Sequence, residues 1–188
     1  CLVGSEMCIR DRAQEYFQRA VKLLEGTDDV REMSRLSTIY GEYMSFYINR
    51  NRMAEAIEIG YRRETVIQRM SGLPGPPPGY IDQQYGFLYA KMAVLLHDEG
   101  KKEEATEIFR KYQSTSFSKT LIGKQYSVPY LLNINQYAEA AALSDTCISA
   151  FTNDTVSYGY LILLNYRARA SRCLLYTSDA ADDRISVD

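Results

Sequence analysis

The stretch YGFLYAKMAVLLHDEGKKEEATEIFRKY, residues 85–112, has apolar residues spaced three and four positions apart on both sides of Gly100. These residues are Tyr89, Met92, Ala93 and Leu96 before the glycine and Ala105, Ile108, Phe109 and Tyr112 after it. Such spacing places them on one face of a helix. Glycine readily adopts the left-handed backbone that ends a helix before a short turn. The stretch therefore predicts two antiparallel helices, each of which must bury one face.

Similar apolar spacing extends outward in both directions. It predicts helical hairpins at about residues 31–70, 80–115 and 119–151, with single helices at 13–25 and 155–172. The residues expected to face inward in the first part of the chain are Ala13, Phe17, Ala20, Leu23, Leu24, Leu36, Ile39, Tyr40, Tyr43, Met44, Tyr47, Ala56, Ile57 and Ile59. The expected fold class is all-α, built of stacked antiparallel helical hairpins.

Three segments interrupt or end this helical pattern. Proline has no N–H donor, so we interpret GLPGPPPG at 72–79 as a rigid connector, with a proline-rich ligand for another domain as the alternative. The Ser/Thr-rich segment 114–120 is expected to fray the helix before it. Pro129 is expected to interrupt the next helix and leave it short or kinked. Arg62 and Arg63 lie near acidic residues and are expected on a solvated face.

A short motif recurs in the three predicted hairpins. It reads NRMAEAIEI at 51–59, GKKEEATEI at 100–108 and NQYAEAAAL at 135–143. Each copy starts with a turn residue and has a Glu-Ala pair whose alanine, Ala56, Ala105 or Ala140, lies five residues later. Ala105 and Ala140 are 35 residues apart, whereas the Pro-rich connector lengthens the interval from Ala56 to Ala105. A period of about 34 residues is typical of stacked helix pairs.

On these motifs the chain resembles the tetratricopeptide repeat family over most of residues 13–172. Ala56, Ala105 and Ala140 match the small residue of the family's second helix, and Ala93 matches the small residue of its first helix. The sequence departs from the family in having no tryptophan, in Gly60 where a bulky residue is usual, and in Arg63 where a second small residue is usual. The resemblance implies a right-handed superhelix of stacked hairpins that binds protein or peptide.

The two ends of the chain resemble translated sequencing-adapter DNA. These segments are CLVGSEMCIRDR at 1–12 and CLLYTSDAADDRISVD at 173–188, and we expect both to be non-native. Cys147 is then the one remaining cysteine, expected as a small buried residue on an apolar face. The tail carries a net charge of −3 and the first segment none, so excluding them changes the formal net charge from −2 to +1. The remaining chain, 13–172, is then an internal piece of a longer protein.

The sequence offers little for catalysis. His97 is the one histidine, with no second ligand or nucleophile at a fitting spacing, so no metal site, no cofactor and no catalytic residue is predicted. The glycines at 72–79 alternate with prolines, which lack the donors that hold phosphate. A charge near neutral argues against nucleic acid as partner despite sixteen tyrosines. No apolar run reaches the roughly 18 residues of a membrane span, and the compartment is not predicted.

The remaining expectation is that the chain has a surface that binds another protein or a peptide. In tetratricopeptide arrays the first helix of each hairpin lines the concave side. The resemblance therefore implies a candidate binding face on the first helices of these hairpins. That face consists of Ser45, Ile48, Asn49, Phe87, Ala90, Val94, His97 and Asp98. It suits a helix or an extended peptide, and ordinary packing against neighbouring repeats is the alternative.

The predicted function is therefore a protein- or peptide-binding scaffold without enzymatic activity. The chain also resembles tyrosine-rich arrays that precede kinase or DNA-binding domains in bacterial signalling proteins. That resemblance implies a sensory or oligomerising role. Self-association is also expected, because a fragment that lacks half a hairpin at each end should expose apolar edges. The alternative is a helical accessory domain of an enzyme whose catalytic residues lie outside this sequence.

Overall fold

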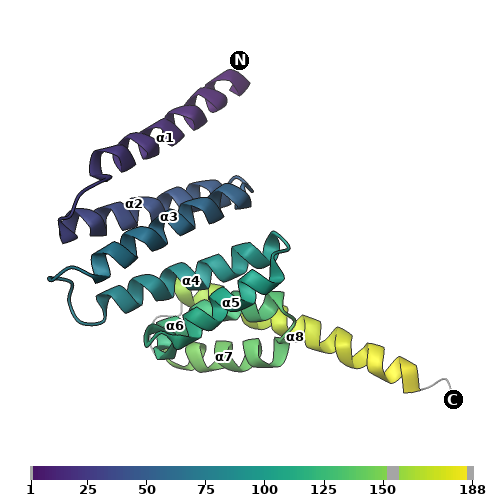
Figure 1. Ribbon diagram of the computed structural model, residues 1–188. Coiled ribbons are helices and arrows are strands. Elements are labelled where there is room, and N and C mark those ends of the chain that lie inside the picture. The colour runs from purple at the N-terminus through teal and green to yellow at the C-terminus, as the bar shows by residue number, and fades with distance from the viewer. Residues whose placement is uncertain (1, 152–156, 186–188) are drawn as a thin grey trace. The chain divides into compact units, whose positions relative to one another are not determined.

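The computed structural model describes the backbone of residues 2–151 and 157–185 and the side chains of residues 12–151 and 157–176. Over these residues the chain is helical and contains no β-strand (Figure 1). The elements are α1 (Leu2–Leu24), α2 (Val30–Ile48), α3 (Met53–Ser71), α4 (Tyr80–Asp98), α5 (Lys102–Ser114), the 3₁₀-helix η1 (Phe117–Lys119), α6 (Leu121–Asn133), α7 (Tyr137–Ser149) and α8 (Tyr158–Ile185). Successive helices pack against each other, so the predicted all-α fold of helical hairpins is confirmed.

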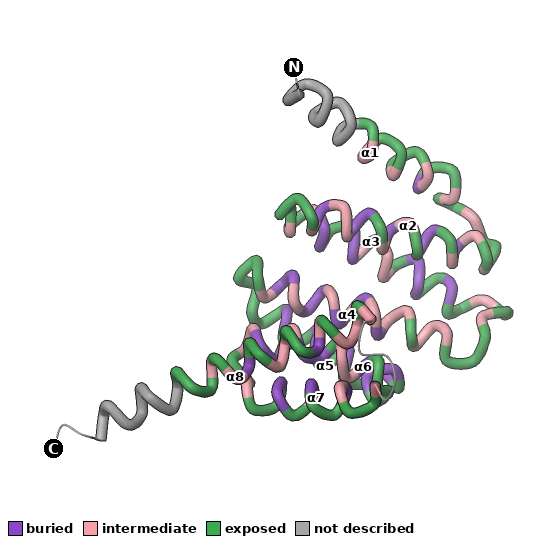
Figure 2. Tube along the Cα trace, turned by 180° about the vertical axis from the view of Figure 1, so that it is seen from behind, coloured by how far each residue is buried: buried purple, intermediate pink, exposed green. Residues whose placement is uncertain are grey.

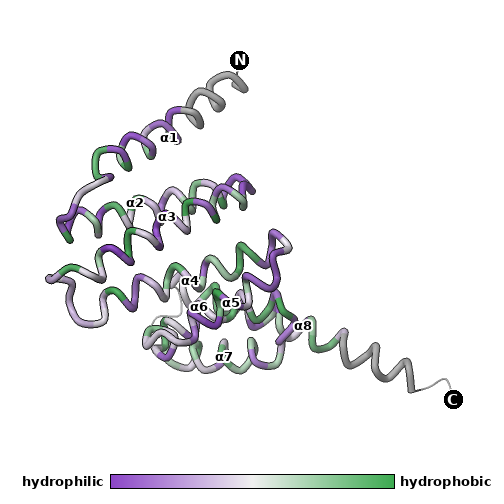
Figure 3. Tube along the Cα trace, in the orientation of Figure 1, coloured by the Kyte–Doolittle hydropathy of each residue, from purple (hydrophilic) through white to green (hydrophobic). Residues whose placement is uncertain are grey.

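The chain divides into two compact units, Cys1–Leu88 and Tyr89–Asp188. Helix α4 contributes its first residues to one unit and its remaining residues to the other. Buried residues recur along the packed helices of each unit, with exposed residues between them (Figure 2). Figure 3 shows the corresponding alternation of apolar and polar residues along α2 and α3. Each unit therefore has a hydrophobic core of its own.

In the first unit, α2 and α3 form an antiparallel hairpin and α1 lies against α2. The Asp29 carboxylate caps α2, because it accepts hydrogen bonds from the N–H groups of Arg31 at 2.9 Å and Glu32 at 3.0 Å. The predicted inward residues of α2 and α3 that are buried are Leu36, Tyr40, Tyr43, Met44, Tyr47, Ala56, Ile57 and Ile59. Ile39 is half-buried. The helical spacing thus identified this core correctly.

Helix α1 differs from the prediction in the residues that face α2. Leu23, expected inward, is 76% exposed, whereas Val21 is 8% exposed. Phe17 does face α2, and its ring stacks on Tyr43 with 4.8 Å between the centroids. Val21 lies about one turn beyond Phe17, and Leu23 lies two residues further, about 200° around the helix. Packing of Phe17 therefore turns Val21 rather than Leu23 towards α2.

The connector at 72–79 turns rather than extends. Gly75 has φ +124° and Gly79 has φ +77°, values that a polyproline helix does not contain. The N–H of Tyr80 donates to the carbonyl oxygen of Pro77 at 3.1 Å, which closes a β-turn directly before α4. A continuous polyproline ligand is therefore not formed, and the segment has the geometry of a tight connector.

In the second unit, α6 and α7 form a hairpin and α8 packs against both. Helix α6 continues through Pro129, so the prediction that this proline interrupts the helix is wrong. The helix is short, as expected, with 13 residues against 19 in α2. Proline removes only one backbone donor, and its neighbours Val128 and Tyr130 are 0% and 2% exposed. Packing of these neighbours therefore holds α6 in place.

The apolar stripes on either side of Gly100 are also confirmed. Their buried members are Met92, Ala93, Leu96, Ala105, Ile108, Phe109 and Tyr112, and Tyr89 is half-buried. The rings of Phe109 in α5 and Tyr130 in α6 stack with 4.2 Å between their centroids. Aromatic stacking thus joins α5 to the next hairpin within this unit.

The segment 114–120 is packed, so the predicted fraying is wrong. The Thr115 hydroxyl donates to the carbonyl oxygen of Tyr112 at 2.7 Å and accepts from the N–H of Ser118 at 3.2 Å. Phe117 in η1 is 5% exposed. Serine and threonine side chains therefore satisfy backbone groups at the end of α5 and hold the segment in place.

The three predicted turns have the same structure. Their central residues, Asn51, Gly100 and Asn135, have φ values of +56°, +80° and +63°. In each turn the next N–H donates back to the carbonyl oxygen of the residue five positions earlier, at 3.0, 2.9 and 2.9 Å. This bond is the one that closes a Schellman motif at the end of a helix. The alanines that follow, at 56, 105 and 140, are 0% exposed, so the recurring motif corresponds to a recurring structure.

The terminal helices are longer than the sequence predicted. Helix α1 begins at Leu2 rather than Ala13, and α8 ends at Ile185 rather than Arg172. Neither 2–12 nor 173–185 contains proline, so no residue there forbids a helix. The predicted turn at Asn153–Thr155 lies outside the described residues.

Candidate functional site: a cleft between α1 and α3

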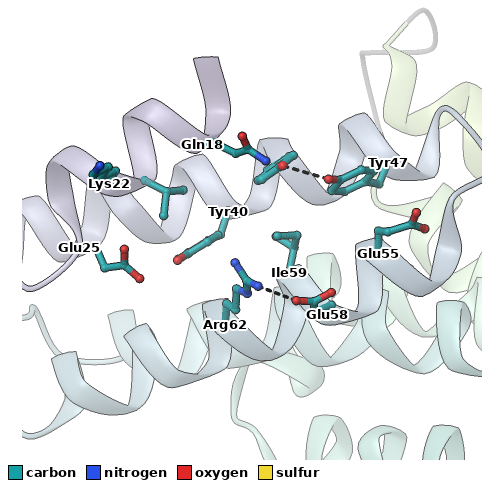
Figure 4. A pocket seen from close by; sticks show the side chains of 11 residues that line it. Gln18, Lys22, Glu25, Tyr40, Tyr47, Glu55, Glu58, Ile59 and Arg62 are labelled. Atoms are coloured by element: carbon teal, nitrogen blue, oxygen red, sulfur yellow. Dashed lines mark hydrogen bonds and ion pairs between the residues drawn. The ribbon is translucent and has the colours of Figure 1, made fainter. Parts of the chain in front are cut away.

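An open cleft of about 340 Å³ lies in the first unit, with α1 on one side, α3 on the other and α2 as its floor (Figure 4). The residues that line it are Gln18, Val21, Lys22 and Glu25 of α1 or its end, Tyr40, Tyr43 and Tyr47 of α2, and Glu55, Glu58, Ile59 and Arg62 of α3. This volume is within the range of small-ligand and side-chain pockets. The cleft forms because α1 and α3 both contact α2.

Three tyrosines on one face of α2 form the floor. The hydroxyl groups of Tyr43 and Tyr47 hydrogen-bond to each other at 2.9 Å, and their rings stack with 4.8 Å between centroids. Burial, and then the hydrogen bond with Tyr47, raise the pKa of Tyr43 far above its ordinary value. The other face of the Tyr43 ring is taken by Phe17. This part of the floor is therefore rigid and neutral.

The charges around the cleft are mostly paired. The Glu58 carboxylate contacts the Arg62 guanidinium at 2.5 Å, and the Glu55 carboxylate contacts Arg52 at 2.6 Å. The hydrogen bond from Arg52 lowers the pKa of Glu55. Both pairs are well exposed, so each contributes little to the stability of the fold. The walls thus present both signs of charge, and Arg62 lies in the exposed ion pair that the sequence predicted.

Arg63 does not lie on that solvated face, so its prediction is wrong. Its Nε donates to the Ser37 hydroxyl at 3.1 Å and its Nη2 to the Gln84 side-chain oxygen at 3.0 Å. The Ser37 hydroxyl donates to the same Gln84 oxygen at 3.1 Å. Burial lowers the pKa of Arg63. The guanidinium fits because a Cβ atom at Gly41 would lie 3.0 Å from its Nη1; a glycine within a predicted helix was the available signal.

The predicted face has four residues in the first unit. Ser45 donates its hydroxyl hydrogen to the carbonyl oxygen of Gly41 at 3.1 Å and is half-buried. Ile48 and Phe87 are half-buried, and Asn49, which ends α2, is exposed. The structure thus leaves part of each of these residues at the surface. Ser45 and Ile48 lie on α2, the helix that also forms the floor of the cleft, whereas Phe87 lies on α4.

The other four predicted residues lie in the second unit. Ala90 is 2% exposed, so its side chain offers almost no surface to a partner. Val94 is half-buried. His97 has an 18% exposed side chain and meets Tyr130 edge to face, with 6.2 Å between centroids. The Asp98 carboxylate accepts a hydrogen bond from the Asn133 amide at 2.8 Å. His97 and Asp98 therefore contact α6 within their own unit.

The sequence pattern did not predict the cleft itself. It placed Tyr40, Tyr43 and Tyr47 on a packing stripe, which is correct for their rings. The Tyr40 hydroxyl lies at the cleft, however, because α1 does not cover α2 over its whole width. Such an opening depends on the distance between α1 and α3, and no local pattern of residues encodes that distance.

Within the part of the chain that the structure describes, no group of three or more His, Cys, Asp or Glu residues could hold a metal ion. Over the same residues no helix is both long and apolar enough to cross a membrane. Cys147 is 1% exposed, and burial raises the pKa of its thiol, which confirms its expected place as a small core residue.

No protein-family model, no curated protein and no solved structure matches this chain.

Proposed function

We propose that this chain is a tetratricopeptide-like scaffold that binds a segment of protein or peptide in the cleft between α1 and α3. The recurring turn at Asn51, Gly100 and Asn135 supports the likeness to that family. The observation that carries the proposal is the open cleft, whose aromatic floor and charged edges come from three successive helices. A surface of this kind suits a peptide that presents both apolar and polar groups.

The role fits the sensory or oligomerising region of a larger signalling protein, as the sequence resemblance implies. Binding in such a region needs no catalytic group, only a surface held by packed helices. The cleft meets this need because its floor is fixed by the stacked rings of Phe17, Tyr43 and Tyr47.

Selection of displayed 12-residue peptides on the immobilised chain tests the proposal, with affinities then measured by fluorescence anisotropy. Lys22→Trp adds bulk at the edge of the cleft, and Arg19→Trp adds the same bulk on an exposed position of α1 that does not line it. We expect Lys22→Trp to weaken binding about tenfold or more and Arg19→Trp to leave it unchanged, with equal helical circular dichroism.

Two results would contradict this proposal. One is a selection that yields no binding peptide. The other is equal binding by Lys22→Trp and the unmodified chain. If Asn49→Trp abolished binding instead, the ligand would occupy the face predicted from the sequence rather than the cleft.

A further inference from the structure

The hydroxyl group of Tyr40 is available to a ligand in the cleft. The residue as a whole is only 4% exposed, and none of the described residues hydrogen-bonds to its hydroxyl. Figure 4 shows this hydroxyl at the cleft, whereas the neighbouring Tyr43 and Tyr47 hydroxyls are bonded to each other. The Tyr40 ring is therefore buried while its hydroxyl faces an open cleft. That hydroxyl can form a hydrogen bond with a ligand, because it has no partner among the described residues.

Opposite charges flank this hydroxyl. Figure 4 shows it between the side chains of Glu25, at the end of α1, and Arg62, on α3. Both charges act on the pKa of Tyr40: burial raises it most, Glu25 raises it further and Arg62 lowers it. The hydroxyl is therefore protonated at neutral pH and can both donate and accept a hydrogen bond.

The mixture of charges disfavours a charged ligand group at this position. An anion would be repelled by Glu25, and a cation would be repelled by Arg62. Lys22 and the Glu58 that pairs with Arg62 extend the same mixture along the cleft. An uncharged group that donates towards Glu25 and accepts from the Tyr40 hydroxyl meets neither repulsion.

The length of the cleft favours main-chain amides as that group. Gln18 and Glu25 both line it and are seven residues apart on or at the end of α1, which corresponds to roughly 10 Å along a helix. An extended chain rises about 3.3 Å per residue, so about three of its residues fit along this wall. Such a chain presents a donor and an acceptor at every peptide group.

We propose that Tyr40 and Glu25 recognise the main chain of one residue of an extended peptide: the N–H of that residue donates to the Glu25 carboxylate and its C=O accepts from the Tyr40 hydroxyl. The inference rests on the proposed function and names the chemistry of that cleft. It assigns Tyr40 a direct role in binding, beside its ring's role in the core. Recognition through the main chain would make binding depend little on the charge of the peptide's side chains.

The experiment uses a peptide obtained from the selection and the full chain. Tyr40→Phe removes only the hydroxyl, and Tyr16→Phe makes the same change at a 64% exposed tyrosine outside the cleft. We expect Tyr40→Phe to weaken binding about 5- to 10-fold, as for one lost hydrogen bond, and Tyr16→Phe to change it less than about twofold. Affinity is measured by isothermal titration calorimetry.

An ester scan of the same peptide identifies the amide, because an ester oxygen replaces one N–H at a time. One ester position should weaken binding to the unmodified chain about fivefold or more, yet have less than about a twofold effect with Glu25→Ala, whose position is exposed. Equal binding by Tyr40→Phe, or no sensitive ester position, would overturn this inference while peptide binding itself stood. A failed selection would remove both proposals.

Discussion

Arg63 in hairpin α2–α3 and Cys147 in hairpin α6–α7 occupy equivalent positions, each seven residues after the fully buried alanine of its hairpin. The Arg63 side chain passes Gly41 and hydrogen-bonds to Ser37 and Gln84. Cys147 is 1% exposed, and its thiol lies 3.6 Å from the Leu121 carbonyl oxygen. The two hairpins thus share a turn and a buried alanine but fill the next core position with side chains of very different size and charge.

The difference shows what the recurring motif controls. The turn sets the residue at which the second helix starts. The residues of the first helix determine the size and polarity of the side chains that the second helix can bury against it. In α2, Gly41 leaves room for a guanidinium, whereas the residue at the same distance before the buried alanine in α6 is Gln125. A polar core position is therefore tolerated where the neighbouring helices supply both space and hydrogen-bond acceptors.

Substitutions at these two positions should give the largest difference in the free energy of unfolding. Cys147→Arg is expected to lower the free energy of unfolding by about 3–5 kcal/mol, since it forces a long charged side chain into the space of a small buried thiol. Lys124 near this thiol would repel the new guanidinium as well. Arg63→Met, the matched change, is expected to alter the free energy by less than about 1.5 kcal/mol. Urea denaturation followed by circular dichroism measures both, and equal stability of Cys147→Arg and the unmodified chain would refute the comparison.

Substitution of two of the helical glycines, Gly41 in α2 and Gly123 in α6, should give the next largest effect. A Cβ atom at Gly123 would lie 2.0 Å from the Phe117 carbonyl oxygen, which is backbone, whereas at Gly41 it would lie 3.0 Å from the flexible end of Arg63. We expect Gly123→Ala to destabilise the protein by about 2–3 kcal/mol. Gly41→Ala should be within about 1 kcal/mol of neutral, because alanine's higher helix propensity offsets the shift of Arg63. Thermal denaturation of the two variants measures this difference. A greater loss of stability in Gly41→Ala than in Gly123→Ala would contradict the expectation.

Alkaline pH should weaken the α2–α3 hairpin through its buried tyrosines. Burial raises the folded-state pKa of Tyr40 and Tyr43 above the unfolded value near 10. Their contribution is therefore complete below pH 10 and is lost as the pH rises towards the folded-state pKa. We expect the free energy of unfolding to fall above pH 10 by up to about 1.4 kcal/mol per pH unit for each such tyrosine.

The matched variant for this pH dependence is Tyr43→Phe, which cannot ionise. Its stability should fall less steeply above pH 10 than that of the unmodified chain, in urea titrations followed between pH 8 and about 11. An unchanged slope would mean that Tyr43 ionises as easily in the folded protein as in the unfolded one.

Local patterns predicted much of this fold. The spacing of Tyr43 and Tyr47, or of Ile108 and Phe109, identifies a buried helix face because a helix brings residues three and four positions apart together. Asn51 and Gly100 were recognised as turn residues because few side chains tolerate a positive φ. These properties depend on a residue and its near neighbours.

Other predictions failed where a distant helix decides. Leu23 and Val21 are both apolar residues of α1, and only the packing of Phe17 on Tyr43 selects which of them is buried. Arg63 looked like its neighbour Arg62 in sequence, yet a glycine in another helix gives it a place in the interior. The candidate site follows the same rule, since the cleft is the space that α1 and α3 leave over α2.

The sequence by itself determined the helices, the three equivalent turns and the buried alanines that follow them, because periodicity and backbone preference act within a few residues. Only the tertiary structure decided that the Tyr40 hydroxyl lies between Glu25 and Arg62. Those charges belong to different helices, far apart in the chain, and their separation depends on how side chains at α1–α2 and α2–α3 fill space. That packing is a property of the assembled first unit and of no single segment.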